Sequence, residues 1–408
     1  MRRTGVIADD FTGATDIASG YVARGHRATV VTDPSAVAGL PDDVDVVVVA
    51  LKTRTSPVDV AVARSLDALE ALQGAHCRQF VLKYCSTFDS TDQGNIGAVL
   101  DALADRLGAD VVTVVPAFPD NGRTVYQGHL FVGADLLEHS SMRHHPLTPM
   151  TRSRVADILR PQTRSTVAEV HLATVRGAAR LDTAISDAGA RYVVVDAVDD
   201  HDLARISEAV AEHVLVSGAA GVALGVTAGS ADPTDAVDAP SGGRLVVCGS
   251  ASARTREQIA AATAAGCPMR QIDVARAVTA RDDIVDETVA WLRGLPADAP
   301  PPVVYTVGTL DDLAGQDLAG DIEAVIAGVV RSAVRTAGIG SIIVAGGETS
   351  GAVVSALGID RLDIGPAIAP GVCWSGARTD DGTSVALALK SGNFGTEDMF
   401  TTAWEALR

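Results

Sequence analysis

Lysine is almost absent from this chain of 408 residues, since it occurs only as Lys52, Lys83 and Lys390 while 30 residues are arginine. Where arginine is used so freely, a retained lysine suggests that a compact ammonium group is needed. Basic residues are also scarce overall, 33 against 51 acidic ones, so the formal net charge is −18. This balance argues against a nucleic-acid partner. It remains compatible with a small anionic ligand, because backbone amides can bind one.

Cysteine pairs with metal-binding or redox spacing are missing. The five cysteines include no CxxC pair, which excludes a zinc knuckle and a dithiol redox motif. Their odd, scattered distribution predicts reduced thiols and a cytoplasmic protein. No apolar segment resembles a signal peptide. The longest uncharged run, residues 214–231, contains four glycines and predicts a buried strand, turn and helix rather than a membrane span.

Several well-known catalytic signatures are missing too. The sequence has no GxxxxGK[ST], no GxGxxG after a predicted strand, no GxSxG and no HExxH. A P-loop, a dinucleotide site of the Rossmann type, a hydrolase elbow and a zinc protease are therefore unsupported. The pair His144 and His145 stands beside prolines and lacks helical metal-ligand spacing, which favours a loop.

What the sequence does contain is a regular alternation of short β-branched runs and alanine-rich helical stretches. This predicts two α/β domains, each with a mainly parallel sheet flanked by helices. Predicted strands in the first half include Gly5–Ala8, Phe80–Leu82 and Val111–Val115, and predicted helices include Thr15–Ala23 and Ala173–Asp187. Residues 124–132 predict a small hairpin outside this rhythm.

The stretch 228–243 is rich in Pro, Asp, Ser and Gly without periodicity, so we interpret it as a linker. The alternation then restarts, with predicted strands that include Leu245–Cys248, Ile342–Ala345 and Val385–Leu389. We therefore predict one domain over residues 1–230 and a second over 242–408. At about 100–200 residues per domain, this division is reasonable for the length.

Three predicted strands of the first half end in polar sequences, where ligands of open α/β sheets bind. Asp9 and Asp10 follow the first strand, ahead of Gly13 and Asp16. These acids indicate binding of hydroxyls or of a metal; the alternative is a helix start capped by Thr12 or Thr15 with solvated carboxylates. Two further strand ends carry the residue types that bind carboxylate or phosphate, with a surface loop as the alternative: Lys83 with Ser86, and Asn121, Gly122 and Arg123.

Three predicted strands of the second half each end in a turn of small residues that opens a helix. Such turns point backbone N–H groups at phosphate. One alone carries little weight, because strand-to-helix turns are often glycine-rich for steric reasons. Three in one domain favour a cradle for nucleotide phosphates. The turns are residues 249–252, 346–351 and 390–395.

In this order, the motifs resemble those of the four-carbon acid sugar kinases. The residues that carry the resemblance are 7–18 (IADDFTGATDIA), 83–91 (KYCSTFDST), 116–133 (PAFPDNGRTVYQGHLFVG), 193–203, 249–259, 346–353 (GGETSGAV) and 387–395 (LALKSGNFG). Within that family, residues 83–97, 126–133 and 140–150 are most similar to members that phosphorylate 3-oxo-tetronates. Threonate and erythronate kinases are the alternative.

The resemblance implies an N-terminal domain that binds the acid sugar and a C-terminal domain that binds ATP, with Mg²⁺ bridging the phosphates. Arg123 and Lys83 would hold the substrate carboxylate, with Asp9, Asp10 and Asn121 bonding its oxygens. Asp10 is the predicted proton acceptor, although spacing does not separate it from Asp9 or Asp16. The implied contacts to ATP are Ser250, Ser252, Gly346, Gly347, Glu348, Thr349 and Gly392.

Two other classes of protein remain open at this point. A Mg²⁺-dependent phosphatase could use the N-terminal acids, but it usually has DxD after its first strand where this sequence has DDF. A sugar-acid sensor without catalysis would leave three phosphate-type turns unexplained. The sequence names no protein ligand to the metal. A homodimer is expected only as the commonest oligomer.

Overall fold

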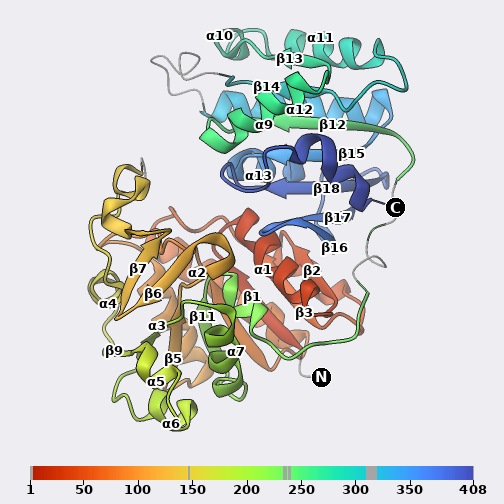
Figure 1. Cartoon of the computed structure of the whole chain (residues 1–408). Coiled ribbons are helices and arrows are strands. Elements are labelled where there is room, and N and C mark those ends of the chain that lie inside the picture. Colours follow the sequence, from red (N-terminus) through yellow and green to blue (C-terminus); the bar gives the residue numbers. More distant parts are fainter. Residues whose placement is uncertain (1–2, 146–147, 233–236, 238–239, 309–318, 408) are drawn as a thin grey trace. The chain divides into compact units, whose positions relative to one another are not determined.

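The computed structural model describes residues 3–145, 148–232, 237, 240–308 and 319–407 (Figure 1). The chain divides into two compact units, Met1–Asp232 and Pro233–Arg408. Each unit contains a mainly parallel sheet flanked by helices, so the predicted fold class is confirmed. None of the described helices is long and apolar enough to cross a membrane.

The sheet of the first unit is parallel throughout, in the order β2-β3-β1-β4-β11-β5-β10-β9. Its strands are rich in Val and other apolar residues, as expected where both faces of a sheet are covered; Val46 to Val49, for example, are fully buried. Their bounds are β1 Thr4–Ala8, β2 Ala28–Val31, β3 Val46–Ala50, β4 Gln79–Lys83, β5 Val112–Val115, β9 Val167–Val170, β10 Tyr192–Val195 and β11 Leu215–Gly218.

The helices of this unit form two groups. Helix α2 (Val58–Gly74) packs against α3 (Ile96–Leu107), whereas α8 (Gly221–Leu224) packs against both α1 (Phe11–Ala23) and α7 (Asp200–Ala209). The prediction of one helix over Ala173–Asp187 was wrong. The chain forms α5 (Leu172–Val175) and α6 (Leu181–Ser186), separated by a turn that contains Gly177, following the short α4 (Val155–Leu159).

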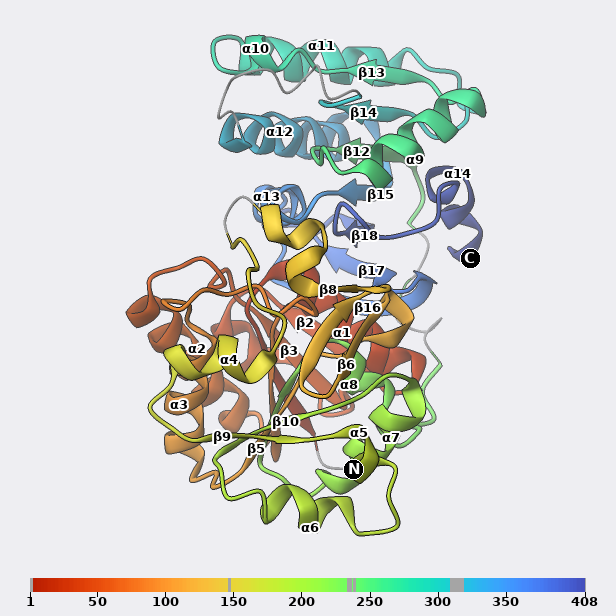
Figure 2. The ribbon, with the colours of Figure 1, turned by 60° about the vertical axis from the view of Figure 1, so that its left-hand side comes forward.

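The hairpin predicted over residues 124–132 is confirmed. Strands β6 (Arg123–Tyr126) and β7 (His129–Val132) pair antiparallel, and β8 (Asp135–Leu136) extends them into a small separate sheet (Figure 2). Gln127 and Gly128 both have positive φ at the turn. Their amides donate to the Asp196 carboxylate, which fastens the hairpin to the end of β10.

The sheet of the second unit has the order β13-β14-β12-β15-β18-β17-β16. Its first five strands are parallel, and β16 and β17 pair antiparallel. These last two strands were not predicted, because glycine and proline interrupt their apolar pattern. The bounds are β12 Gly243–Cys248, β13 Met269–Gln271, β14 Val303–Tyr305, β15 Ile339–Ala345, β16 Arg361–Ala369, β17 Val372–Arg378 and β18 Ser384–Lys390.

The helices of the second unit cover this sheet, with α11 against α12, α12 against α13, and α9 against α14 (Figure 2). The core includes Trp374 and Trp404, whose ring centroids lie 5.3 Å apart. The helices are α9 Ala253–Ala264, α10 Val274–Ala277, α11 Arg281–Arg293, α12 Ala319–Ala337, α13 Gly347–Ala356 and α14 Met399–Thr402.

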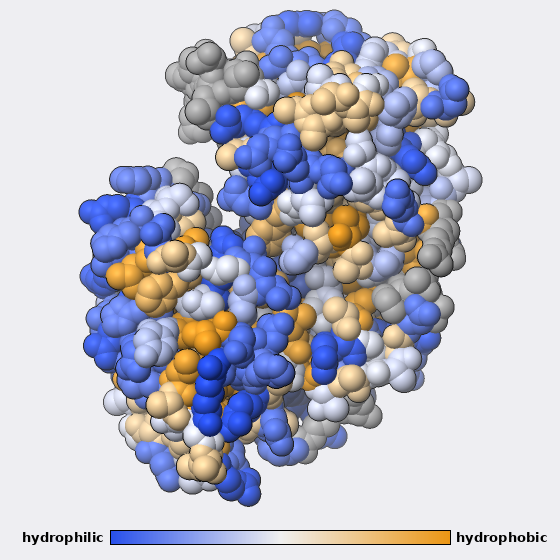
Figure 3. All heavy atoms as spheres, in the orientation of Figure 1, coloured by the Kyte–Doolittle hydropathy of each residue, from blue (hydrophilic) through white to orange (hydrophobic). Residues whose placement is uncertain are grey.

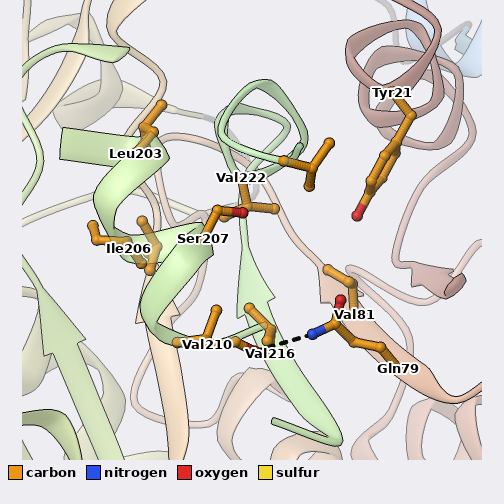
Figure 4. A pocket seen from close by; sticks show the side chains of 11 residues that line it. Tyr21, Gln79, Val81, Leu203, Ile206, Ser207, Val210, Val216 and Val222 are labelled. Carbon is orange, nitrogen blue, oxygen red and sulfur yellow. Dashed lines mark hydrogen bonds between the residues drawn. The ribbon is translucent and has the colours of Figure 1, made fainter. Parts of the chain in front are cut away.

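A small cavity of about 30 Å³ lies between the first unit's sheet and its helices α1, α7 and α8 (Figure 4). Val81, Val216 and Val222 line it, and Gln79 at the start of β4 donates to the Val210 carbonyl beside it. It has room for about one water molecule. A space of this size is too small for a sugar acid or a nucleotide, so we interpret it as a packing defect. Figure 3 shows hydrophilic and hydrophobic residues mixed across the face of the chain in view.

Candidate active site

The first candidate site lies where β1 and β4 end. The two strands are parallel neighbours, with Ala8 opposite Lys83. From β1 the chain crosses through α1 to β2, and from β4 it crosses through α3 to β5 on the other side of the sheet order. Adjacent strands whose connections diverge leave a crevice at their carboxyl ends, which is the usual ligand position in open α/β sheets. The first two polar motifs found in the sequence, which begin at Asp9 and at Lys83, both lie here.

Asp9 and Asp10 share one arginine. Arg54 donates from Nε and from one terminal nitrogen to the two oxygens of Asp9, at 2.9 and 2.7 Å. The same terminal nitrogen lies 2.9 Å from Asp10. Burial raises the pKa of Asp9 even though Arg54 opposes the effect. Burial acts on Asp10 in the same sense, but the charges of Arg54 and Lys83 outweigh it and lower its pKa.

Sequence reasoning missed Arg54. It lies on the turn after β3, and the backbone N–H groups of Thr53 and Arg54 both donate to the Asp9 carbonyl. Asn95, at the start of α3, donates from its amide to the carbonyls of Thr53, Arg54 and Ser56 at 2.7 to 3.3 Å. The only signal in the sequence was an arginine four residues after a buried strand.

Asp10 also caps helix α1. Its carboxylate accepts from the Gly13 N–H at 2.9 Å and from the Thr12 hydroxyl at 3.2 Å. The predicted cap by Thr12 or Thr15 was therefore wrong, and α1 begins at Phe11 rather than at Thr15. Asp10 suits this position because one carboxylate oxygen accepts from the Gly13 N–H while the other accepts from the Thr12 hydroxyl.

Lys83 is only 2% exposed and its ammonium donates to the Tyr84 carbonyl at 2.9 Å. A Cβ atom at Gly13 would lie 2.9 Å from Lys83 Nζ and 2.2 Å from an Asp10 oxygen. Gly13 is therefore what allows the ammonium to approach the start of α1. The surface-loop alternative for Lys83 does not hold.

The turn after β4 adds hydroxyls and a carboxylate. Thr87 donates to Asp89 at 2.5 Å, and Cys85 Sγ lies 2.9 Å from the Thr87 hydroxyl. Burial raises the pKa of Cys85 to about 12, so this cysteine stays a thiol at neutral pH. Ser86 is half-buried in the same turn.

Asn121 and Gly122 form a tight turn that leads directly into Arg123, the first residue of β6. Gly122 has φ +68°, and one terminal nitrogen of Arg123 donates to the Asn121 carbonyl. Burial lowers the pKa of Arg123, and the charges of Asp89 and Asp16 oppose this. The turn thus faces the acidic residues that follow β4 and that line α1.

The second candidate site lies where β12, β15 and β18 end. Cys248 is opposite Ala345, and Ala345 is opposite Lys390, so the three strands end level with one another. From β12 the chain crosses through α9 to β13, whereas from β15 it crosses through α13 towards β16 on the other side. This is again a point where connections diverge. All three predicted small-residue turns lie here.

The turns of residues 249–252 and 390–395 meet. Ser252 caps α9 by accepting from the Thr255 N–H at 3.2 Å, and Thr255 donates to the Gly392 carbonyl at 2.9 Å. A Cβ atom at Gly392 would lie 2.3 Å from the Ser250 hydroxyl and 2.9 Å from the Ser252 hydroxyl. The close packing explains the glycine and leaves both hydroxyls at a helix N-terminus.

The turn after β15 packs equally closely against the turn of residues 249–252. Gly346 has φ +134°, so a side chain there would be strained, and a Cβ atom at Gly249 would lie 2.3 Å from the Thr349 hydroxyl. Thr349 is buried in the first turn of α13, next to Gly347, while Glu348 is exposed. The N-termini of α9 and α13 therefore begin side by side, at the ends of adjacent strands.

Lys390 is the first residue of the predicted turn 390–395, but sequence reasoning assigned it no contact of its own. It is fully buried, and its ammonium donates to the Gly392 carbonyl at 2.9 Å and to the Thr255 hydroxyl at 3.2 Å. Burial lowers its pKa to about 8. The sequence shows that Lys390 is one of only three lysines. Its burial and its hydrogen bonds inside the turn are seen only in the structure.

The fold and these two sites define a class of protein: a two-unit α/β enzyme in which one unit offers charged side chains and the other offers small-residue turns at helix N-termini. Among the described residues no group of three His, Cys, Asp or Glu side chains is placed to hold a metal ion.

Comparisons with known proteins agree with this class. A family model described as a sugar-binding N-terminal domain matches residues 4–226, and one described as a nucleotide-binding C-terminal domain matches residues 245–400. Curated proteins named 3-oxo-tetronate kinase are similar along the whole chain. That of Burkholderia multivorans is 44% identical over 99% of this chain and 97% of its own length, and that of Cupriavidus necator 42% over 99% and 96%.

Two solved structures share the fold. A candidate tRNA synthase from Salmonella typhimurium LT2 has a TM-score of 0.89 at 38% identity, with 99% of each chain covered. A protein from Haemophilus influenzae has a TM-score of 0.79 at 38% identity, covering 99% of this chain and all of the other. The chain therefore belongs to the four-carbon acid sugar kinase family, with its sugar-binding N-terminal and nucleotide-binding C-terminal domains, and it is an ATP-dependent kinase.

Proposed function

We propose that the chain transfers the terminal phosphate of ATP to the C4 hydroxyl of 3-oxo-tetronate and so forms 3-oxo-tetronate 4-phosphate. The observation that carries this proposal is the similarity along the whole chain to proteins named 3-oxo-tetronate kinase, at 44% and 42% identity for the two described above. D-Threonate and D-erythronate remain the alternative substrates, because the reaction and the sites would be the same.

The domain over residues 1–230 would bind the acid sugar. Arg123 would hold the substrate carboxylate with the Asn121 amide, and Gly122 would set the turn that presents them. Lys83 and Ser86 would contact further substrate oxygens, together with Asp9 and Asp10. The buried Nε of Arg123 and the buried amide nitrogen of Asn121 have no hydrogen-bond partner in the described part of the chain, which supports a ligand at this place.

The domain over residues 242–408 would bind ATP. Ser250, Ser252 and Gly392 are close enough to one another that a single Cβ atom would fill the space between them, and this fits backbone contact with phosphate oxygens. Gly346, Gly347, Glu348 and Thr349 would add the N-terminus of α13. Mg²⁺, held mostly by phosphate oxygens and water, would neutralise charge on the phosphates.

Phosphoryl transfer depends on positioning and charge neutralisation more than on covalent help from the protein. The residues of the first unit would orient the C4 hydroxyl, and a carboxylate there would accept its proton. Asp10, with Asp9 beside it, was the sequence-based choice for that role. We further propose a cytoplasmic homodimer; the five free cysteines are consistent with a reducing compartment.

The proposal is tested by measuring ADP release from ATP and Mg²⁺ with a panel of four-carbon acids. The panel contains 3-oxo-tetronates generated in situ, D-threonate and D-erythronate. We expect turnover with a 3-oxo acid. Turnover with threonate or erythronate alone would transfer the proposal to those substrates, and absence of ADP from every acid despite ATP binding would contradict it. Phosphate release from a phospho-acid without ATP would support the phosphatase instead.

A further inference from the structure

The three acids around the start of α1 differ in how far their oxygens are already used. Both oxygens of Asp9 accept from Arg54. Asp10 accepts from Gly13 and Thr12 and pairs with Arg54 as well. A carboxylate that must take up a new proton needs an oxygen that is still available. Asp9 and Asp10 are therefore poorly suited to that task.

Asp16 is different. It lies in the second turn of α1, its residue is only 7% exposed, and its buried Oδ1 has no hydrogen-bond partner in the described part of the chain. The charge of Lys83 favours the ionised form of Asp16, that of Asp10 opposes it and that of Arg123 favours it, so these three groups lie near Asp16. A buried carboxylate oxygen without a donor is costly, and such atoms in native structures call for an explanation.

The turn of residues 121–123 carries hydrogen-bond donors that lack an acceptor. Arg123 Nε and Asn121 Nδ2 are buried donors without an acceptor among the described residues. Asp16 and Arg123 are near enough for their charges to interact, so the unused acceptor and the unused donors lie in the same part of the first unit. A ligand that satisfies both must carry a hydroxyl donor and an anionic acceptor. A four-carbon acid has one at each end.

We propose, on the basis of the function proposed above, that Asp16 rather than Asp10 is the proton acceptor of the reaction. The Asp16 carboxylate accepts the hydrogen bond of the C4 hydroxyl while Arg123 and Asn121 hold the carboxylate at the other end. In the transfer step the bond between O4 and the terminal phosphorus forms. The bond from that phosphorus to ADP breaks with its electron pair staying on ADP, and the O4 proton goes to Asp16.

The pKa of Asp16 suits its role as proton acceptor. Burial raises the pKa of Asp16 to about 6, against the pull of Lys83 on β4 and Arg123 on β6. An acceptor works best when its pKa lies near the working pH, because it is then both ionised and basic. The pKa of Asp10 is lowered instead, which makes it a weaker base. The other charged groups of the site are Asp9, Arg54 and Asp89.

The test uses the full-length enzyme with ATP, Mg²⁺ and the accepted four-carbon acid. Asp16→Asn should lower kcat by about 100- to 10,000-fold while KM for ATP changes less than about threefold. Asp10→Asn should chiefly raise KM for the acid. In the wild type, kcat should fall below a pH of about 6, and the residual activity of Asp16→Asn should lack that dependence.

Three controls separate catalysis from folding. Asp101→Asn changes an acid of the same 7% exposure on α3, whose carboxylate accepts from Tyr192 and Thr163; it should lower the melting temperature with kcat retained. Asp16→Asn should melt no lower than the wild type. Asp16→Glu keeps a carboxylate and should recover part of the lost kcat.

A kcat for Asp16→Asn within threefold of the wild type would overturn the proposal. If that variant does not fold, a wild-type kcat that stays constant from pH 5 to 7 would overturn it equally. Absence of wild-type turnover with every acid of the panel would instead contradict the proposed function, so the two failures are distinguishable.

Discussion

The ends of β1 and β4 in the first unit and the ends of β12, β15 and β18 in the second occupy the same topological position, yet they are built from different chemistry. The first collects Asp9, Asp10, Arg54, Lys83 and Arg123. The second offers helix N-termini, two serine hydroxyls and close glycines around one buried lysine. Charged side chains select a small acid with few atoms, whereas backbone amides fit phosphates whatever nucleoside carries them.

The largest effect should come from the charged site. Arg123→Ala removes the guanidinium proposed to hold the substrate carboxylate, and charged hydrogen bonds of this kind contribute about 1.5–3 kcal/mol each. We expect KM for the acid to rise about 100-fold while KM for ATP changes little, in steady-state ADP release. Arg106→Ala, on an exposed residue in the last turn of α3, is the matched control and should have no effect. Equal changes in both KM values would refute the assigned role of Arg123.

The buried charges of Asp16 and Lys390 allow the two sites to be compared through the pH dependence of the free energy of unfolding. The pKa of Asp16 is raised from 3.8 to about 6, so the folded state binds that proton more tightly and stability is lost as pH rises from 3.8 to 6. Relative to the wild type, Asp16→Asn should therefore gain up to about 3 kcal/mol in free energy of unfolding at pH 7. Urea denaturation measures this, and a less stable variant at pH 7 would contradict it.

Lys390 should behave in the opposite sense. Its pKa is lowered from 10.5 to about 8, so the folded state releases that proton more readily and stability rises between pH 8 and 10.5. Lys390→Met lacks this rise, which amounts to about 3 kcal/mol. The measurement is urea denaturation of both proteins from pH 7 to 10. If the difference in free energy of unfolding between wild type and variant stayed constant over that range, burial would not destabilise the ammonium form of Lys390.

Gly392→Ala should have a smaller effect, confined to the nucleotide. Its methyl group would displace the Ser250 and Ser252 hydroxyls, so KM for ATP should rise about tenfold, which is about 1.4 kcal/mol. Gly320→Ala on α12 of the same unit provides the control, because a Cβ atom there meets nothing within 4 Å. Calorimetric titration with ATP checks the binding directly. Equal affinities for the two variants would remove Gly392 from the phosphate site.

The smallest effect on activity belongs to the cavity beside α7. Val216→Ala enlarges it and should lower the free energy of unfolding by about 1–2 kcal/mol, because buried methyl groups are lost without repacking. We expect kcat and both KM values to stay unchanged, since none of the residues assigned to the charged site lines the cavity. Altered kinetics would show that the packing around this cavity affects the charged site.

The sequence predicted the alternation of strands and helices and the strand ends that carry polar residues, because both follow from local periodicity. It did not predict Arg54, since pairing with Asp9 depends on β3 and β1 being neighbours. It could not rank Asp9, Asp10 and Asp16 as proton acceptors, because their difference lies in which oxygens are already hydrogen-bonded. β16 and β17 were missed because antiparallel pairing, rather than periodicity, stabilises strands that contain Gly and Pro.

The rarity of lysine has a practical consequence for chemical labelling. Lys83 is 2% exposed and Lys390 is fully buried, whereas Lys52 is exposed on the turn that carries Arg54. An amine-reactive fluorophore should therefore attach to one lysine side chain under mild conditions. That position is two residues from the arginine that pairs with Asp9, so the dye would report acid binding as a change in emission without any engineered cysteine.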